Sequence, residues 1–258
     1  MAMEHLTYSP FVLDVYSFCG QSAVNEIAFD SIEKVAMRMR DKNRLNMVKL
    51  RLAAEVALGV ADIHEGSGGN GPFQDQPAMV HYDINPRNVA VTSRGHVKIN
   101  DFNVAEFLKW NKVEQKVCKF EGRFYEPWWR APEEVLKPKI GEDPTLLDEK
   151  VDVYSLCNVL FRIMTGRAPR GKSISSRVEE MRDEVSKGIP PALPKLYLTT
   201  EDEALIAIRK SMMTCYRLKP EDRLTAREIG DFLYEKFETL SQKTKAKKAK
   251  KSKLKINR

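Results

Sequence analysis

Three oxygen-bearing side chains, Asp83, Asn88 and Asp101, flank two short apolar runs in the middle of this 258-residue chain. The runs, at 89–91 and 97–99, have the β-branched composition of small strands. The loops at the ends of two such strands would bring the three side chains together, and their carboxylate and amide oxygens are the hard ligands that Mg²⁺ prefers. Asp and Asn also favour turns, so ordinary turn formation is the alternative role for each residue.

The elements around these residues predict an α+β chain that is mainly α-helical. Near the N-terminus, strands are expected at 11–18 and 22–28. Apolar residues spaced by three and four predict a long helix over 45–63. Beyond Asp152 the apolar period is helical throughout, and a capping box at 225–228 marks the start of the last helix.

Composition excludes several classes of protein. Apolar residues make up 42% of the chain and charged residues 31%, which is unlike a wholly disordered chain, and 13 glycines exclude a collagen-like one. No apolar run is long enough to span a bilayer, and residues 1–10 lack the apolar core of a signal peptide. We therefore expect a soluble chain with one large core and no export signal.

The four cysteines and four histidines show no metal-ligand spacing, so no zinc site is expected. A chain with so large a core needs no disulfide framework, and reduced thiols of an intracellular protein are expected. The cysteines are Cys19, Cys118, Cys157 and Cys215.

Charge is concentrated at the C-terminus. Residues 241–258 carry eight lysines, one arginine and no acid, which leaves 34 basic and 36 acidic residues for the rest of the chain. Like charges repel, so this Lys-rich tail is expected to be disordered. An acidic partner, a nuclear import receptor, an anionic membrane and nucleic acid would all suit such a tail, and a solvated tail with no partner is the alternative.

Two glycine patterns match nucleotide-binding motifs only in their letters. The G-x-G-x-x-G pattern at 66–71 follows a helix rather than a strand, so we interpret it as a loop. The Walker A pattern at 166–173 also follows residues with helical periodicity, and no parallel βαβ sheet is visible after it. A P-loop NTPase therefore stays a remote alternative.

Three segments in a fixed order are much stronger evidence of function than these two glycine patterns. They are VHYDINPRNVAV at 80–91, VKINDFN at 97–103 and WWRAPEE at 128–134. They resemble the catalytic loop, the D-F-G segment and the A-P-E segment of the eukaryotic protein kinase family. The resemblance covers about residues 10–240 and lies mostly in the large C-terminal lobe of that fold. It implies a partial N-terminal lobe with the hinge at 1–28, a C-terminal lobe at 29–240 and the tail at 241–258.

The resemblance also implies site residues and the cofactors ATP and Mg²⁺. Asp83 matches the residue that accepts the proton of the attacking protein hydroxyl. Asn88 and Asp101 match the residues that hold Mg²⁺ and through it the phosphates, and the hinge residues that would contact adenine are Asn25, Ile27 and Ala28. Four further matches are structural in the family, namely His81, Glu133, Asp152 and Arg223.

Several positions depart from the family pattern. Tyr82 replaces an arginine that clamps a phosphorylated activation loop, so that clamp should be lost. Asn85 stands where serine/threonine-type kinases have a phosphate-contacting lysine, and Arg87 stands where many tyrosine-type kinases have an arginine with a similar role. Asn103 replaces the D-F-G glycine and tolerates the positive φ expected there. These departures give no prediction of serine/threonine against tyrosine specificity.

A complete N-terminal lobe would add a glycine-rich loop, a lysine on its third strand and a glutamate on its helix, and residues 1–28 contain no match to them. Two interpretations follow. The chain is a truncated protein kinase with little activity alone, or it is a non-catalytic, pseudokinase-like binding module. The intact metal ligands favour truncation. Under either interpretation the chain is expected in the cytoplasm, or in the nucleus if the tail is an import signal.

Overall fold

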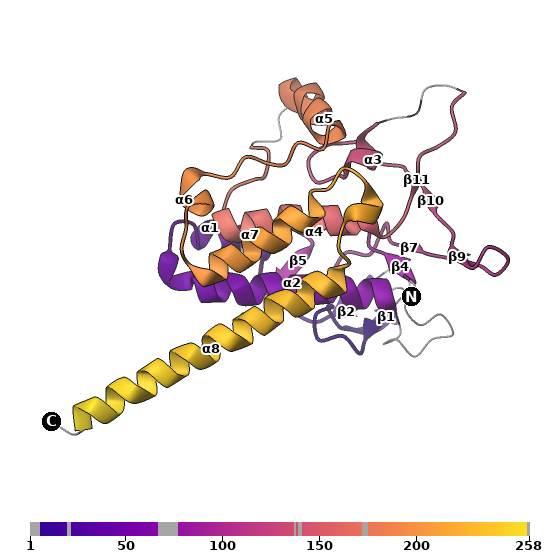
Figure 1. Cartoon of the computed structure of the whole chain (residues 1–258). Coiled ribbons are helices and arrows are strands. Elements are labelled where there is room, and N and C mark those ends of the chain that lie inside the picture. Colours follow the sequence, from indigo (N-terminus) through magenta and orange to yellow (C-terminus); the bar gives the residue numbers. More distant parts are fainter. Residues whose placement is uncertain are drawn as a thin grey trace.

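The computed structural model describes residues 6–19, 22–66, 77–136, 138, 141–171 and 175–256. Helices form the body of the molecule, small strands lie beside and between them, and the C-terminal helix extends far beyond the body (Figure 1). The family resemblance implied this α+β, mainly helical arrangement, and the structure confirms it.

Four helices, α2, α4, α7 and α8, pack against one another and supply most of the buried core. Smaller helices lie around them. The helices are α1 (Ile32–Arg38), α2 (Asn46–Glu65), α3 (Pro132–Val135), α4 (Lys150–Thr165), α5 (Val178–Ser186), α6 (Lys195–Leu198), α7 (Glu203–Cys215) and α8 (Ala226–Ile256).

The strands are short and form one three-stranded sheet and four two-stranded pairs. All of the pairings between them are antiparallel. The three-stranded sheet has the order β3-β5-β6, and the pairs are β1-β2, β4-β7, β8-β9 and β10-β11. The strands are β1 (Val15–Cys19), β2 (Ser22–Asn25), β3 (Asp30–Ser31), β4 (Met79–Val80), β5 (Val89–Val91), β6 (Val97–Ile99), β7 (Glu106–Phe107), β8 (Trp110–Asn111), β9 (Lys116–Val117), β10 (Phe120–Glu121) and β11 (Leu146–Leu147).

The helix predicted over 45–63 is confirmed as α2, which packs against strand β6 of the three-stranded sheet. It ends at Gly66, whose φ of 66° is the conformation that glycine adopts at little steric cost. A β-carbon at Gly59 of α2 would stand only 3.0 Å from Ile99 of β6, so the glycine allows helix and strand to approach closely. Most of the glycine-rich pattern at 66–71 lies outside the described residues.

The N-terminal segment is less regular than predicted. The strand expected over 11–18 begins only at Val15, because 11–13 instead lie along β6, where Ile99 donates to the Phe11 carbonyl at 2.7 Å and accepts from Leu13 at 2.9 Å. The second strand ends at Asn25. Lys98 of β6 pairs with Asp14 at 3.0 Å, which ties the β1-β2 hairpin to the body.

The Lys-rich tail differs from the predicted disorder. Helix α8 continues through Ile256, with the described side chains at 242–247 exposed to solvent (Figure 1). Lysine and alanine are good helix formers, and extending an existing helix avoids the unfavourable nucleation step. Across the described ranges, none of the helices combines the length and apolarity needed to cross a membrane.

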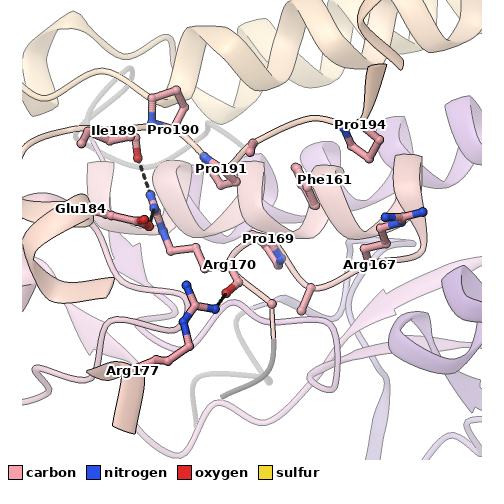
Figure 2. A pocket seen from close by; sticks show the side chains of 13 residues that line it. Phe161, Arg167, Pro169, Arg170, Arg177, Glu184, Ile189, Pro190, Pro191 and Pro194 are labelled. Carbon is pink, nitrogen blue, oxygen red and sulfur yellow. Dashed lines mark hydrogen bonds and ion pairs between the residues drawn. The ribbon is translucent and has the colours of Figure 1, made fainter. Parts of the chain in front are cut away.

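The P-loop alternative is wrong. The residues before Gly166 belong to helix α4 rather than to a strand, and Gly166 itself ends that helix in the left-handed conformation. Residues 167–171 line a cavity of about 380 Å³ beside the proline-rich stretch at 189–194 (Figure 2). There the Arg170 guanidinium is already paired with Glu184 at 2.9 Å and bonded to the Ile189 carbonyl. The rest of the pattern, 172–174, lies outside the described residues.

Two cysteines also differ from expectation. Cys157 of α4 and Cys215 of α7 are fully buried and form a disulfide, with Cα atoms 6.0 Å apart, whereas four reduced thiols were expected. The packing of α4 on α7 brings them together, and their separation of 58 residues in the sequence carries no signal of this contact.

Candidate active site

A buried carboxylate holds the loop that carries Asp83. Asp152, in the first turn of α4, is only 1% exposed, and its two oxygens accept hydrogen bonds from the main-chain amides of His81 at 2.7 Å and Tyr82 at 2.9 Å. His64 of α2 adds a third contact at 3.2 Å. Because a buried carboxylate needs such partners, Asp152 fixes the backbone immediately before Asp83 to the helical core.

Two asparagine side chains orient the carboxylate of Asp83. Asn88 donates from Nδ2 to Oδ2 of Asp83 at 2.7 Å and to its carbonyl oxygen at 3.0 Å. Asn85 donates to the same two oxygens at 3.1 Å. The Asp83 side chain remains 36% exposed, so it faces solvent from a fixed position.

The strand pair β5-β6 brings Asp101 to this loop. The main-chain amide of Asn100 donates to the carbonyl of Asn88 at 3.0 Å, immediately before Asp101. His81, fully buried, accepts from the Asp83 amide at Nδ1 and donates from Nε2 to the Asn100 carbonyl at 2.9 Å. The loop of Asp83 and the loop of Asp101 are therefore connected through one histidine and one strand pair.

The oxygen donors suit a magnesium ion held with a nucleotide. Asp101 is exposed, and its left-handed φ of 66° turns the chain at that point. Within the described part of the chain, no three His, Cys, Asp or Glu side chains gather as metal ligands. Mg²⁺ is commonly held by one or two protein oxygens with substrate phosphates rather than by an all-protein cage. Asp101 and Asn88 have oxygens of this kind, and their joint role as metal ligands remains a prediction.

The turn after Asp101 differs in detail from the prediction for Asn103. The positive φ lies at Asp101, and Asn103 is outside the left-handed region. A hydrogen bond of 3.2 Å from the Ala105 amide to the Phe102 carbonyl closes the turn. The substitution of glycine by Asn103 is therefore accommodated without unusual backbone at that residue.

The cation nearest to the Asp83 carboxylate is Arg130, which the sequence analysis did not single out. Its Nη2 lies 3.5 Å from Oδ1 of Asp83, and its Nη1 donates to the Tyr82 carbonyl at 2.6 Å. Arg87 is 74% exposed and lies 4.0 Å from Glu33. The structure does not bring Arg87 to Asp83, and its phosphate-contacting role remains a prediction.

The two carboxylates of the 128–134 segment, the partly buried Glu133 and the buried Glu134, have different partners. Glu133 forms a two-pronged ion pair with Arg223 at 2.6 and 2.7 Å, and the arginine side chain is fully buried. Glu134 accepts from the Ala131 amide at 2.7 Å and contacts Arg130 at 3.2 Å. Burial nevertheless raises the pKa of Glu134 to about 7, because the apolar surroundings disfavour its charge more than these partners favour it.

The hinge residues lie apart from this hydrogen-bond network. The side chains of Asn25, Ile27 and Ala28 are all exposed, with Ile27 at 87%. They precede β3, which pairs with β5 next to Asn88. Their contact with adenine remains a prediction.

Comparisons with known proteins match the chain to one family. The family model of the protein kinase domain matches residues 1–234. The tousled-like 2 serine/threonine-protein kinase of Homo sapiens is 26% identical over 161 residues, which cover 60% of this chain and 20% of that protein. Receptor-interacting serine/threonine-protein kinase 4 of Mus musculus is 24% identical over 219 residues, covering 85% of this chain and 25% of that protein.

A third relative, the serine/threonine-protein kinase cds1 of Schizosaccharomyces pombe, is 31% identical over 155 residues, covering 58% of this chain and 30% of that protein. The chain thus corresponds to less than one third of the length of each of these relatives. The kinase-domain match, in contrast, covers most of the chain itself. The chain belongs to the protein kinase family.

Proposed function

We propose that this chain carries the catalytic lobe of a protein kinase, which transfers a phosphoryl group from MgATP to a protein hydroxyl. The observation that carries the proposal is the connection of Asp83, Asn88 and Asp101 through the hydrogen bonds of one loop and one strand pair. The transfer needs mainly positioning and charge stabilisation, which a fixed set of oxygen donors supplies.

In the proposed mechanism Asp83 is the proton acceptor. Its carboxylate is held by Asn85 and Asn88 and stays open to solvent, so a substrate hydroxyl can approach it and give up its proton during transfer. Asn88 and Asp101 would hold the magnesium ion, which neutralises charge on the phosphates when it is bound with ATP. Arg130 lies 3.5 Å from Asp83 and supplies a positive charge beside its carboxylate.

The substrate class we propose is the hydroxyl of serine or threonine. The support is the printed description of the relatives in human, mouse and fission yeast, all of which are serine/threonine-protein kinases. Peptides that differ only in carrying serine, threonine or tyrosine at one position test this choice directly. Transfer to the tyrosine peptide alone would overturn it.

The activity test compares Asp83→Asn with a matched control, Asp231→Asn, on the exposed face of α8. With radiolabelled MgATP, the wild-type chain should transfer phosphate to protein slowly, and Asp83→Asn should reduce that rate by about a hundredfold or more. The control should transfer at the wild-type rate. Equal rates in wild type and Asp83→Asn would contradict the proposed role of Asp83.

A non-catalytic binding module is the second candidate. The observation that favours it is that residues 1–28 contain no lysine, so this part of the chain supplies no cation for the ATP phosphates. Saturable binding of MgATP without any transfer would support this candidate. Transfer that appears after upstream sequence is added would instead support a truncated kinase.

For the Lys-rich end of α8 we propose contact with an acidic partner, either an import receptor or an anionic membrane surface, in an intracellular protein. The support is its charge and the solvent exposure of 242–247. A fluorescent fusion with residues 241–258 deleted tests it. The import role predicts that the deletion lowers the nuclear fraction, and an unchanged distribution between nucleus, cytoplasm and membrane would contradict the proposal.

A further inference from the structure

The side chain of Tyr82 lies at the centre of contacts between the Asp83 loop and the segment 120–130. It is 1% exposed, and its hydroxyl oxygen accepts hydrogen bonds from the main-chain amides of Arg123 at 2.8 Å and Phe124 at 3.4 Å. Residues 122–126 belong to no helix or strand, so these two bonds replace the main-chain partners that regular structure would provide.

Aromatic and cationic groups surround the ring of Tyr82. Phe120 meets it edge-on with ring centres 4.9 Å apart, and Phe124 lies at 5.3 Å. The guanidinium of Arg130 lies 5.0 Å from the ring centres of both Tyr82 and Phe124, and that of Arg123 lies 5.7 Å from both. Such stacking fixes the ring and the segment relative to each other.

The main chain of Tyr82 is held as firmly as its side chain. Its amide donates to Asp152 of α4 at 2.9 Å, and its carbonyl accepts from Arg130 at 2.6 Å. These contacts stabilise a left-handed φ of 62°, which is unfavourable for a tyrosine. One residue therefore connects the helical core, the segment 120–130 and, through the next peptide bond, Asp83.

The cations around Tyr82 already have anionic partners in the chain. Arg123 pairs with Glu106 at 2.5 Å, and Arg130 contacts Glu134 at 3.2 Å and Asp83 at 3.5 Å. Burial also raises the pKa of the Tyr82 phenol, which keeps the hydroxyl neutral. The Tyr82 hydroxyl holds the segment as a neutral acceptor, and Arg123 and Arg130 are already paired with carboxylates. A phosphate group is therefore not required as a further partner for these cations.

We infer that Tyr82 is a positioning residue whose hydroxyl holds residues 123–124 against the Asp83 loop, so that the segment 120–130 keeps its place without a phosphate group. The inference rests on the proposed kinase function only for its catalytic consequence. Its structural part concerns contacts that exist whether or not the chain transfers phosphate.

The first test is hydrogen exchange in Tyr82→Phe, which removes only the hydroxyl. The matched control is Tyr216→Phe, since Tyr216 is also buried and its hydroxyl donates to Asn158 at 2.9 Å. Asn158 bonds the carbonyl of Trp129 at 3.1 Å, so this control reaches the segment at residue 129 and not at the amides of 123–124. Exchange of the amides at 123–124 should rise by about tenfold in Tyr82→Phe, because each amide loses its hydrogen bond to the Tyr82 hydroxyl, and should stay unchanged in the control. Unchanged exchange in Tyr82→Phe, or an equal rise in both variants, would overturn the inference.

The second test concerns phosphate. Wild-type chain treated with a phosphatase until its intact mass shows no phosphate should keep the slow exchange at 123–124. Faster exchange after this treatment would contradict the inference, because the segment would then depend on a modification.

The third test separates positioning from general stability. With wild-type transfer measurable, Tyr82→Phe should lower kcat by about tenfold and leave the KM for MgATP within about twofold, because the nucleotide ligands are untouched. An equal loss of kcat in Tyr216→Phe would contradict a positioning role. If the wild-type chain transfers no phosphate at all, the proposed function fails, and the two exchange measurements still decide the inference.

Discussion

The side-chain amide of Asn88 donates a hydrogen bond of 2.7 Å to the carboxylate of Asp83, five residues earlier in the same loop. The same amide bonds the Asp83 carbonyl at 3.0 Å, so one asparagine fixes both the backbone and the side chain of the proposed proton acceptor. Because Nδ2 is engaged in this way, Oδ1 of Asn88 is the atom that would coordinate a metal ion at the proposed site.

This relationship predicts the effect of Asn88→Ala on stability. Loss of both hydrogen bonds in a buried position should lower the free energy of unfolding by about 1–3 kcal/mol. The control is Asn103→Ala, an exposed asparagine two residues after Asp101, which should change it by less than about 0.5 kcal/mol. Urea denaturation measures both values, and equal effects of the two substitutions would contradict the role given to Asn88.

Breaking the ion pair between Arg223 and Glu133 should be far more damaging. Because the Arg223 side chain is fully buried, Glu133→Ala leaves an uncompensated charge inside the protein and should lower the free energy of unfolding by about 3–5 kcal/mol. Lys187→Ala removes a surface pair with Asp183 whose side chains are 60% and 61% exposed, and should have almost no effect. Similar denaturation midpoints for the two variants would show that the buried pair is not needed for folding.

Asp152 is expected to stabilise the protein by holding the main chain of the Asp83 loop. Asp152→Asn puts an amide donor where the carboxylate now accepts from the amides of both His81 and Tyr82, so one buried N–H loses its partner. We expect a loss of about 1–3 kcal/mol and faster hydrogen exchange at these two amides. Exchange at wild-type rates would mean that Asp152 does not hold the loop.

The raised pKa of Glu134 predicts that the stability of the protein depends on pH. Its pKa is about 7 in the folded protein, raised by burial, and near 4.3 in an unfolded chain. Between these pKa values Glu134 is protonated in the folded state and ionised in the unfolded state. Protonation therefore stabilises the folded protein fully below pH 4, and this stabilisation is lost as the pH rises through 7. This stabilisation amounts to roughly 4 kcal/mol at most.

Glu134→Gln isolates that contribution. The free energy of unfolding of the wild-type protein should fall more between pH 5 and pH 7.5 than that of Glu134→Gln, which carries no titrating group at this position. The difference between the two curves is the quantity to measure by urea denaturation. Parallel curves would contradict the raised pKa of Glu134.

The sequence was sufficient to predict secondary structure where a local pattern of residues determines it. The short apolar runs at 89–91 and 97–99 are strands with the predicted bounds, and the three- and four-residue period over 45–63 is helix α2. The motif spacing also predicted that Asp83, Asn88 and Asp101 lie in loops beside those strands, and the structure has them there. Their joint role in binding a metal ion stays a prediction.

The sequence was insufficient where residues far apart make the contact. Arg130 contacts Asp83 although 47 residues separate them in the sequence, and no periodic pattern predicts that contact. Tyr82 was interpreted as the loss of a phosphate clamp, because its residue type does not reveal that two main-chain amides approach its hydroxyl. Helix α1 was not predicted either, since its seven residues are too few for a clear period.

The central claim is that Asn88 and Asp101 form one divalent-ion site that works with a nucleotide beside Asp83. The most direct measurement is a Mn²⁺ titration, followed by electron paramagnetic resonance, with a non-hydrolysable ATP analogue present. We predict one bound ion per wild-type chain, and affinity at least about tenfold weaker in both Asn88→Ala and Asp101→Asn but unchanged in Asp231→Asn. Equal binding by all four proteins, or no nucleotide-dependent binding by the wild type, would contradict the claim.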